Sequence, residues 1–261
     1  MDIDLSQYVR VGRYDLPEPT RTSAPVGNVL AQEVSGVTYN WDTDTLFVVG
    51  DGGTSVTQID KMGNLIDTMT LAPGGSSQGT EFFDPEGITY VGNGQFVMTE
   101  ERDRNAVLFT YSAGTTLTRA DTQTAHIGTN VGNVGLEGLS YDPLTNGFIF
   151  VKEKTPESVF QTTIDFATDT ASNGSASTVA STDLFDPTLL NLIDIADVFA
   201  LSNISSAVGA DEEGNLLILS QESAQILEVD RSGNILSSLA IQADPGNPLD
   251  VVSQQHEGLT M

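Results

Sequence analysis

The chain has 261 residues, with 36 acidic and 10 basic side chains, a net charge of −26 at pH 7 and no cysteine. This charge argues against a nucleic-acid partner, because phosphates are bound by Lys and Arg, and against docking on anionic membranes. The lack of cysteine excludes disulfides, thiol catalysis and zinc–thiolate sites. No apolar run approaches the ~18 residues of a spanning helix, so we expect no membrane span.

We expect no targeting segment in the N-terminal residues. Met1-Asp2-Ile3-Asp4 has neither the basic n-region nor the apolar h-region of a signal peptide. The side-chain types of residues 7–15 alternate along the chain as they do in a strand, which predicts a short strand there. Pro17 and Pro19 follow it and end it. We interpret residues 1–261 as one domain of a longer protein that is exported to an extracellular or periplasmic location. The acidic composition suits a halotolerant or extracellular protein or the loading of divalent cations, or it serves only to keep the surface soluble.

A short motif recurs along the chain with a period near 50 residues. It pairs Glu-Gly with an apolar residue and a hydroxyl in Glu86-Gly87-Ile88-Thr89, Glu137-Gly138-Leu139-Ser140 and Glu257-Gly258-Leu259-Thr260. Weaker copies begin at Ser35 and Ser206, so the five copies start at 35, 86, 137, 206 and 257. Strand-like units at such a fixed period are typical of propellers and repeat arrays.

Each unit continues with a turn, a buried apolar strand, a polar loop and a third strand. The apolar strands are 46–49, 96–98, 148–151 and 216–219, and the third strands are 55–59, 106–111, 158–163 and 225–229. Units one and four add a fourth strand, ending at Leu71 and Ile241. Four antiparallel strands per repeat form a propeller blade. The sequence therefore predicts an all-β, five-bladed β-propeller with four full blades plus an incomplete fifth.

Two features interrupt this regular plan. Between the third and fourth copies, Asp186-Pro187 is followed by Leu and Ile at helical spacing, which predicts a helical insertion over 187–199. The fifth unit begins at Glu257 and stops at Met261, too soon for a blade. Open sheet edges invite pairing, so we expect either self-association or a partner segment to complete the fifth blade.

The acidic position of the motif predicts a metal site. First strands line a propeller's channel, so carboxylates at one position of several blades converge near its axis, here Glu86, Glu137 and Glu257. Aligned second strands predict a second ring at the same mouth, made of Asp51, Glu100, Glu153 and Gln221. Such carboxylates either take up protons or bind a cation, and hard oxygen ligands favour Ca²⁺, with Mg²⁺ as the second choice. The alternative is that each Glu only caps its strand.

Other polar residues near these rings extend the prediction. Four bases follow the second strands of adjacent blades: Arg102, Arg104, Lys152 and Lys154. They either hold a small anionic ligand or pair with neighbouring acids. His256 adjoins Glu257 and is the candidate catalytic base. Asp194 and Asp197 are placed to compensate for Ser206 at the fourth copy.

Several stretches together resemble the SdiA-regulated (YjiK-like) family of bacterial proteins. The matching residues are 84–90, 98–104, 135–143, 151–154, 217–223 and the terminal 257–261. The resemblance implies a five-bladed propeller with a bound calcium ion and no established biochemical activity. The family is distantly similar to NHL-repeat and lactonase-like propellers, some of them metal-dependent hydrolases.

Two functions remain as hypotheses. The first is a calcium-binding propeller domain of an exported bacterial protein, with a binding or structural role. The second is a metal-dependent hydrolase of phosphoesters or lactones, with its site at the propeller mouth and His256 or a carboxylate as base. We favour the first, because the sequence identifies no clear general base.

Overall fold

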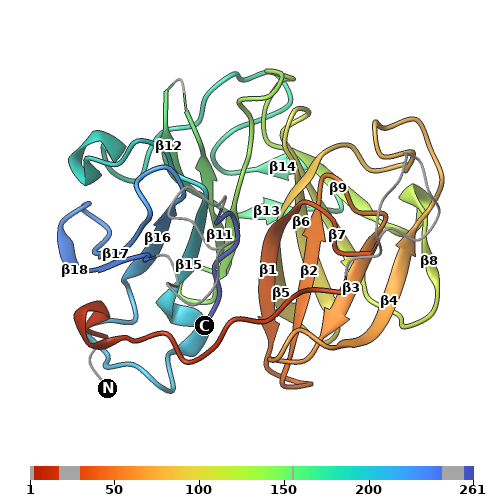
Figure 1. Ribbon diagram of the computed structural model, residues 1–261. Coiled ribbons are helices and arrows are strands. Elements are labelled where there is room, and N and C mark those ends of the chain that lie inside the picture. The colour runs from red at the N-terminus through yellow and green to blue at the C-terminus, as the bar shows by residue number, and fades with distance from the viewer. Residues whose placement is uncertain (1–2, 18–29, 155, 243–255) are drawn as a thin grey trace.

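The computed structural model describes residues 3–17, 30–154, 156–242 and 256–261. Within these ranges the chain is almost entirely β-structure, and its helical elements are short 3₁₀ turns. The strands form separate, mainly antiparallel sheets set around a common centre (Figure 1). The predicted all-β propeller arrangement is confirmed.

Four sheets form the blades. The first holds β1 (Val34–Asn40), β2 (Thr45–Gly50), β3 (Ser55–Ile59), β4 (Leu65–Leu71) and the added edge strand β8 (Thr116–Leu117). The second holds β5 (Pro85–Gly92), β6 (Gln95–Glu100), β7 (Asn105–Thr110) and β9 (Gln123–His126). The third holds β10 (Leu139–Asp142), β11 (Gly147–Lys152) and β12 (Ser158–Thr162), followed by a hairpin of β13 (Ile164–Asp165) and β14 (Thr170–Ala171). The fourth holds β15 (Asp197–Ala200), β16 (Leu216–Ser220), β17 (Gln225–Val229) and β18 (Ile235–Ala240).

The predicted number of blades is wrong, because the described residues form four blades and not five. Residues 256–261 carry no assigned strand, yet they lie between β15 and β1. The Leu259 N–H donates to Asp197 Oδ2 at 2.7 Å, and the Tyr39 N–H donates to the Thr260 hydroxyl at 3.0 Å. The last residues therefore bridge the first and fourth blades through the fifth copy of the motif, with no fifth sheet around it in the described part of the chain.

The hydroxyl of the motif links neighbouring inner strands. In each case a backbone N–H donates to the hydroxyl of the neighbouring motif copy at 2.9–3.0 Å: Tyr39 to Thr260, Tyr90 to Thr38, Tyr141 to Thr89 and Ala200 to Ser140. The motif glycine serves the same close approach, because a Cβ on Gly87 would lie only 2.8 Å from the Glu137 carbonyl oxygen. The repeat therefore encodes contacts between blades.

The fourth copy of the motif lies earlier than predicted. Val198 pairs with Ile218 as Val37 pairs with Val48, so the fourth inner strand is β15 and its motif starts at Ala196. Asp197 stands where the other copies have glycine, and Phe199 stands where they have a hydroxyl. Because the two residues that identify the motif are changed here, the repeat spacing predicted the fourth copy at residues 206–210. Those residues follow the turn η4 (Leu201–Ile204).

The predicted helical insertion over 187–199 is also wrong. Asp186 caps the turn as expected, since its Oδ1 accepts from the Thr188 N–H at 3.0 Å. The turn η3 (Pro187–Leu190) then ends at Asn191, whose φ of 52° is left-handed. Ile195 is fully buried in the core of the fourth blade, and β15 follows. Ile195 and Val198 therefore pack in that core, whereas Leu189 and Ile193, which helical spacing had assigned to a helix, are exposed.

The predicted strand over 7–15 is absent from the described residues 3–17. That segment contains the 3₁₀ turn η1 (Leu5–Gln7) and otherwise irregular backbone. Its Ile3 and Leu5 are buried against the fourth blade, where the Leu5 N–H donates to the Ser237 hydroxyl at 3.0 Å. The remaining short turn, η2 (Arg119–Asp121), lies between β8 and β9.

Apolar residues fill the spaces between facing blades and fix their orientation. Phe47 of β2 and Phe96 of β6 meet with ring centroids 4.6 Å apart, between the first and second blades. Phe150 of β11 stacks on Phe160 of β12 at 5.5 Å, in the core shared by the second and third blades. With the blades held in this way, the starts of the inner strands meet at one end of the channel.

Candidate metal centre

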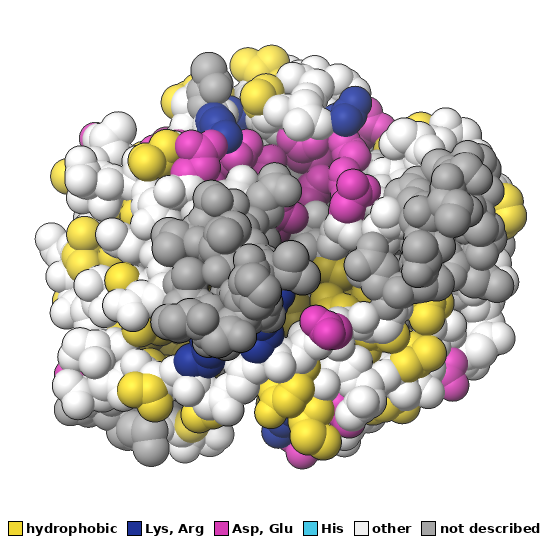
Figure 2. All heavy atoms as spheres, in the orientation of Figure 1, with side chains coloured by type: hydrophobic (Ala, Val, Ile, Leu, Met, Phe, Trp, Pro, Cys, Tyr) yellow, Lys and Arg dark blue, Asp and Glu magenta, His cyan; other side chains and the backbone are white. Residues whose placement is uncertain are grey.

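An acidic cavity opens at the end where the inner strands begin. It has a volume of about 640 Å³, and eight carboxylates line it: Glu33, Asp51, Glu86, Glu101, Glu137, Glu153, Glu222 and Glu257. Among the described residues that line it, Lys154 is the one base. Figure 2 shows the acidic side chains gathered at the upper centre of the molecule, with basic side chains at the margin.

The two predicted rings meet in this cavity. Glu86, Glu137 and Glu257 reach it from the starts of three motif copies, and Asp51, Glu153 and Gln221 reach it from the loops after β2, β11 and β16. The arrangement follows from antiparallel pairing, because the end of a second strand lies beside the start of the first. Five of the six predicted metal ligands therefore share one space.

Glu100 is the predicted ligand that does not line the cavity. It is fully buried and forms an ion pair with Arg119, and its Oε1 accepts from the Phe83 N–H at 2.7 Å. Glu101 occupies the position equivalent to Asp51. Ile88 and its partner Met98 are one residue closer in sequence than Val37 and Val48, so alignment of the apolar runs alone selects the wrong glutamate.

The four predicted anion-binding bases do not form one site. Arg102 pairs with Asp84 and donates to Asn133 at 2.7 Å. Arg104 is buried and donates to the Val179 carbonyl, and the buried Lys152 donates to the Pro156 carbonyl at 2.7 Å. Lys154 alone of the four lines the cavity.

The predicted catalytic base, His256, is half-buried beside the motif and is not among the described residues that line the cavity. The other histidine, His126, is exposed at the end of β9, where its Nδ1 lies 2.8 Å from Asp169 Oδ2. The structure therefore brings no histidine into the acidic cavity among the residues it describes.

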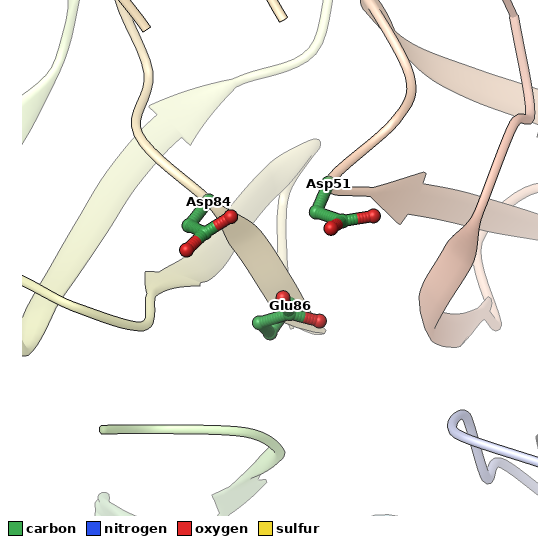
Figure 3. A group of neighbouring side chains, drawn as sticks. All are labelled: Asp51, Asp84 and Glu86. Atoms are coloured by element: carbon green, nitrogen blue, oxygen red, sulfur yellow. The ribbon is translucent and has the colours of Figure 1, made fainter. Parts of the chain in front are cut away.

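One group of carboxylates, which we call the Asp51 cluster, joins the first two blades. Asp51 follows β2, Asp84 directly precedes β5 and Glu86 lies on β5 (Figure 3). Each offers a carboxylate oxygen, and the three oxygens lie within 4.8 Å of one another. The backbone at Asp84 is left-handed, with a φ of 55°, and the Glu101 N–H donates to its carbonyl at 3.0 Å. This turn places Asp84 across from Asp51.

A second group, which we call the Asp194 cluster, joins the third and fourth blades. It contains Glu153, Asp194 and Glu222, which also offer oxygens within 4.8 Å of one another. Sequence reasoning placed Asp194 near the fourth copy and missed Glu222, although Glu222 directly follows the predicted ring position Gln221. It also missed Asp84 as a ligand, although Asp84 lies only two residues before the predicted ligand Glu86.

Burial and like charges raise the pKa values of several of these groups. Burial, followed by the charge of Glu101, raises the pKa of Glu137 to about 9. The pKa of Glu101 is raised to about 7 by burial, against a hydrogen bond from the Gly135 N–H that lowers it. The pKa of Glu86 is raised well above its usual value by burial and then by Glu137, and that of Asp51 is raised by burial and then by Glu33.

These shifts have a simple chemical meaning. The cavity carboxylates cannot all be ionised without a positive counter-charge, so they hold protons or a cation. Their oxygen-only donor set, with flexible carboxylates from several loops, fits the ligand requirements of calcium. By contrast, the buried Asp142 is paired with Arg231 at 2.8 Å.

None of the helical turns that the structure describes is long and apolar enough to cross a membrane. Among solved structures, the fold is similar to a luciferin-regenerating enzyme, with 13% identity, a TM-score of 0.47 and coverage of 84% of this chain and 79% of that one. It is also similar to virginiamycin B lyase from Staphylococcus aureus, with 15% identity, a TM-score of 0.41 and coverage of 95% and 63%. The family model named SdiA-regulated matches residues 20–261, so the chain belongs to the SdiA-regulated family.

Proposed function

We propose that this chain is a calcium-binding propeller in which the acidic cavity holds the ion at the Asp51 cluster. The observation that carries the proposal is the convergence of eight carboxylates on one cavity, with Lys154 as the one base among its described lining residues. A divalent cation would neutralise groups that otherwise retain protons. Calcium is favoured over magnesium because it accepts more oxygen ligands in less regular geometry.

The proposed role of the ion is to link blades. Asp51 belongs to the first blade, whereas Asp84 and Glu86 belong to the second, so one ion would contact both. Binding that occurs only in the folded state stabilises that state. The proposal includes export, since extracellular modules commonly bind calcium with a Kd of ~10⁻⁴–10⁻³ M.

A metal-dependent hydrolase is the second candidate function. The observation that favours it is Glu101, which lines the cavity and whose pKa is raised to about 7 by burial. A carboxylate with such a pKa can accept a proton from water near neutral pH. Phosphoesters or lactones are the substrate classes that an ion at this mouth would polarise.

The experiment is thermal unfolding of the metal-free protein with and without calcium. At calcium concentrations 100 times the Kd, the free energy of unfolding should rise by about 2.7 kcal/mol. The double substitution Asp51→Asn and Glu86→Gln should reduce this gain, whereas Asp211→Asn, an exposed acid outside the cavity, should leave it unchanged. An equal gain in all three proteins, or none in the parent, contradicts the proposal.

An activity screen separates the two candidates. Calcium-loaded protein is assayed on aryl phosphates, esters and lactones, with Glu101→Gln as the comparison variant. Turnover that is lost in Glu101→Gln, while calcium still raises the unfolding temperature, supports the hydrolase. No turnover together with calcium stabilisation supports a binding or structural role.

A further inference from the structure

We propose that the cavity contains a second divalent-cation site, built from the Asp194 cluster and occupied by the Lys154 ammonium group when metal is absent. Its three carboxylates are Glu153, Asp194 and Glu222. None of them belongs to the Asp51 cluster, so the two sites have separate ligands. The second site goes beyond the proposed function, because it can bind calcium whether or not the Asp51 cluster does.

The first observation is an unsatisfied buried oxygen. Asp194 is fully buried, and its Oδ1 accepts from the Ser220 hydroxyl and from the Glu222 N–H at 3.0 Å. Its Oδ2 is also buried and has no hydrogen-bond partner among the described residues. A buried carboxylate oxygen without a partner is costly, and coordination by a cation would remove that cost.

The neighbouring residue adds a second unsatisfied oxygen. Gln221 lines the cavity, and its amide oxygen Oε1 is buried without a hydrogen-bond partner in the described part of the chain. Amide and carboxylate oxygens are both ligands that calcium accepts. Gln221 directly precedes Glu222, so the same loop after β16 can supply two ligands of different kinds.

The third observation is the position of Lys154. Its Nζ lies 2.8 Å from Glu153 Oε1 and 2.5 Å from Glu222 Oε1, so the cluster already attracts one positive group. Three carboxylates against one ammonium group leave an excess negative charge, which a divalent ion would balance better. The Lys154 side chain is 39% exposed, and its flexible stem lets the ammonium group move into solvent when an ion enters.

Isothermal titration of the metal-free chain with calcium chloride tests this site. The parent should bind two calcium ions. Lys154→Met should tighten one of them by at least about tenfold, because a competing positive charge is removed. Lys61→Met is the matched control, since Lys61 pairs with the exposed Asp44 at 2.5 Å and does not line the cavity. Its isotherm should match that of the parent.

Two further variants separate this proposal from the Asp51 site. Glu222→Gln, which removes a partly exposed ligand, should weaken one calcium ion by at least about tenfold and leave the other unchanged. The double substitution Asp51→Asn and Glu86→Gln should keep the ion that responds to Lys154→Met. The second site is refuted if neither Lys154→Met nor Glu222→Gln changes any binding constant, whatever the Asp51 variants do. Calcium binding that responds to Lys154→Met but not to the Asp51 variants refutes the Asp51 site alone.

Discussion

Buried carboxylates occur in two regions of this propeller, and their surroundings differ. Inside the blades, Glu100 is paired with Arg119, and Asp142 with Arg231 at 2.8 Å. In the cavity, Glu86 and Glu137 have raised pKa values because they are buried beside other acids. Glu100 and Asp142 thus have an arginine as counter-charge, whereas Lys154 is the one base among the described residues that line the cavity.

This difference separates structural acids from ligands. An acid that is paired with a shielded arginine gains little from an external ion, whereas acids that face one another need protons or a cation. The adjacent residues Glu100 and Glu101 differ in this way, since Glu100 is paired with Arg119 and Glu101 lines the cavity. Acid content alone would not distinguish them.

The largest expected effect on stability comes from removing an acid that is paired with an arginine. Glu100→Gln should lower the free energy of unfolding by about 2 kcal/mol, because the buried Glu100 carboxylate loses its charged contact with the partly exposed Arg119 and its bonds from the Phe83 N–H and the Asn105 amide are weakened. Calcium affinity should not change. Urea unfolding and calcium titration measure the two quantities. The matched control is Glu101→Gln, which removes the neighbouring charge. Equal loss of stability in both variants would contradict the distinction.

A pH series tests the unpaired region. The pKa of Glu137 is raised from 4.5 to about 9, so the folded state holds its proton more tightly than the unfolded state does. The resulting stability is present below about pH 4.5 and is lost as the pH rises towards about 9. Between pH 6.5 and 7.5 the metal-free protein should lose up to about 1.4 kcal/mol from this one group.

Glu137→Gln supplies the control for the pH series, because it removes the titrating group while keeping a similar shape. Its metal-free unfolding free energy should depend less steeply on pH over the same interval. Saturating calcium should also flatten the profile of the parent, since a bound cation replaces the protons. An unchanged slope in Glu137→Gln would show that this carboxyl is not the one that titrates.

The smallest effect concerns a residue that belongs to both regions. Asp84 is part of the Asp51 cluster and also pairs with Arg102, whose side chain is 52% exposed. Because exposed ion pairs contribute little, Arg102→Gln should change stability by less than about 1 kcal/mol. It should strengthen calcium binding, because Asp84 loses a competing partner. Weaker calcium binding in this variant would place Asp84 with the paired acids instead.

Local patterns in the sequence were sufficient to predict the positions of most strands. The predicted strands 55–59 and 225–229 coincide with β3 and β17, because alternation and flanking turns depend on adjacent residues. The shared mouth of the two carboxylate rings was predictable as well, since it follows from antiparallel pairing within each blade. Both inferences need only the covalent spacing of residues in one unit.

Local patterns could not predict the register of the strands or the closure of the ring of blades. A hairpin that is one residue shorter placed Glu101 and not Glu100 at the cavity, although both follow the same apolar run. The fourth inner strand has Asp197 in place of glycine, so only its pairing with β16 identifies it. These positions depend on partners distant in sequence, which no local pattern specifies.

The sequence by itself determined the all-β repeat, the blade-sized units and the acidic character of the motif. The tertiary structure alone decided that the described residues form four blades, bridged by residues 256–261, and which acids have a base beside them. The physical reason is that strand formation depends on neighbouring residues. The charge balance around a buried carboxylate depends instead on side chains that folding brings together from separate blades.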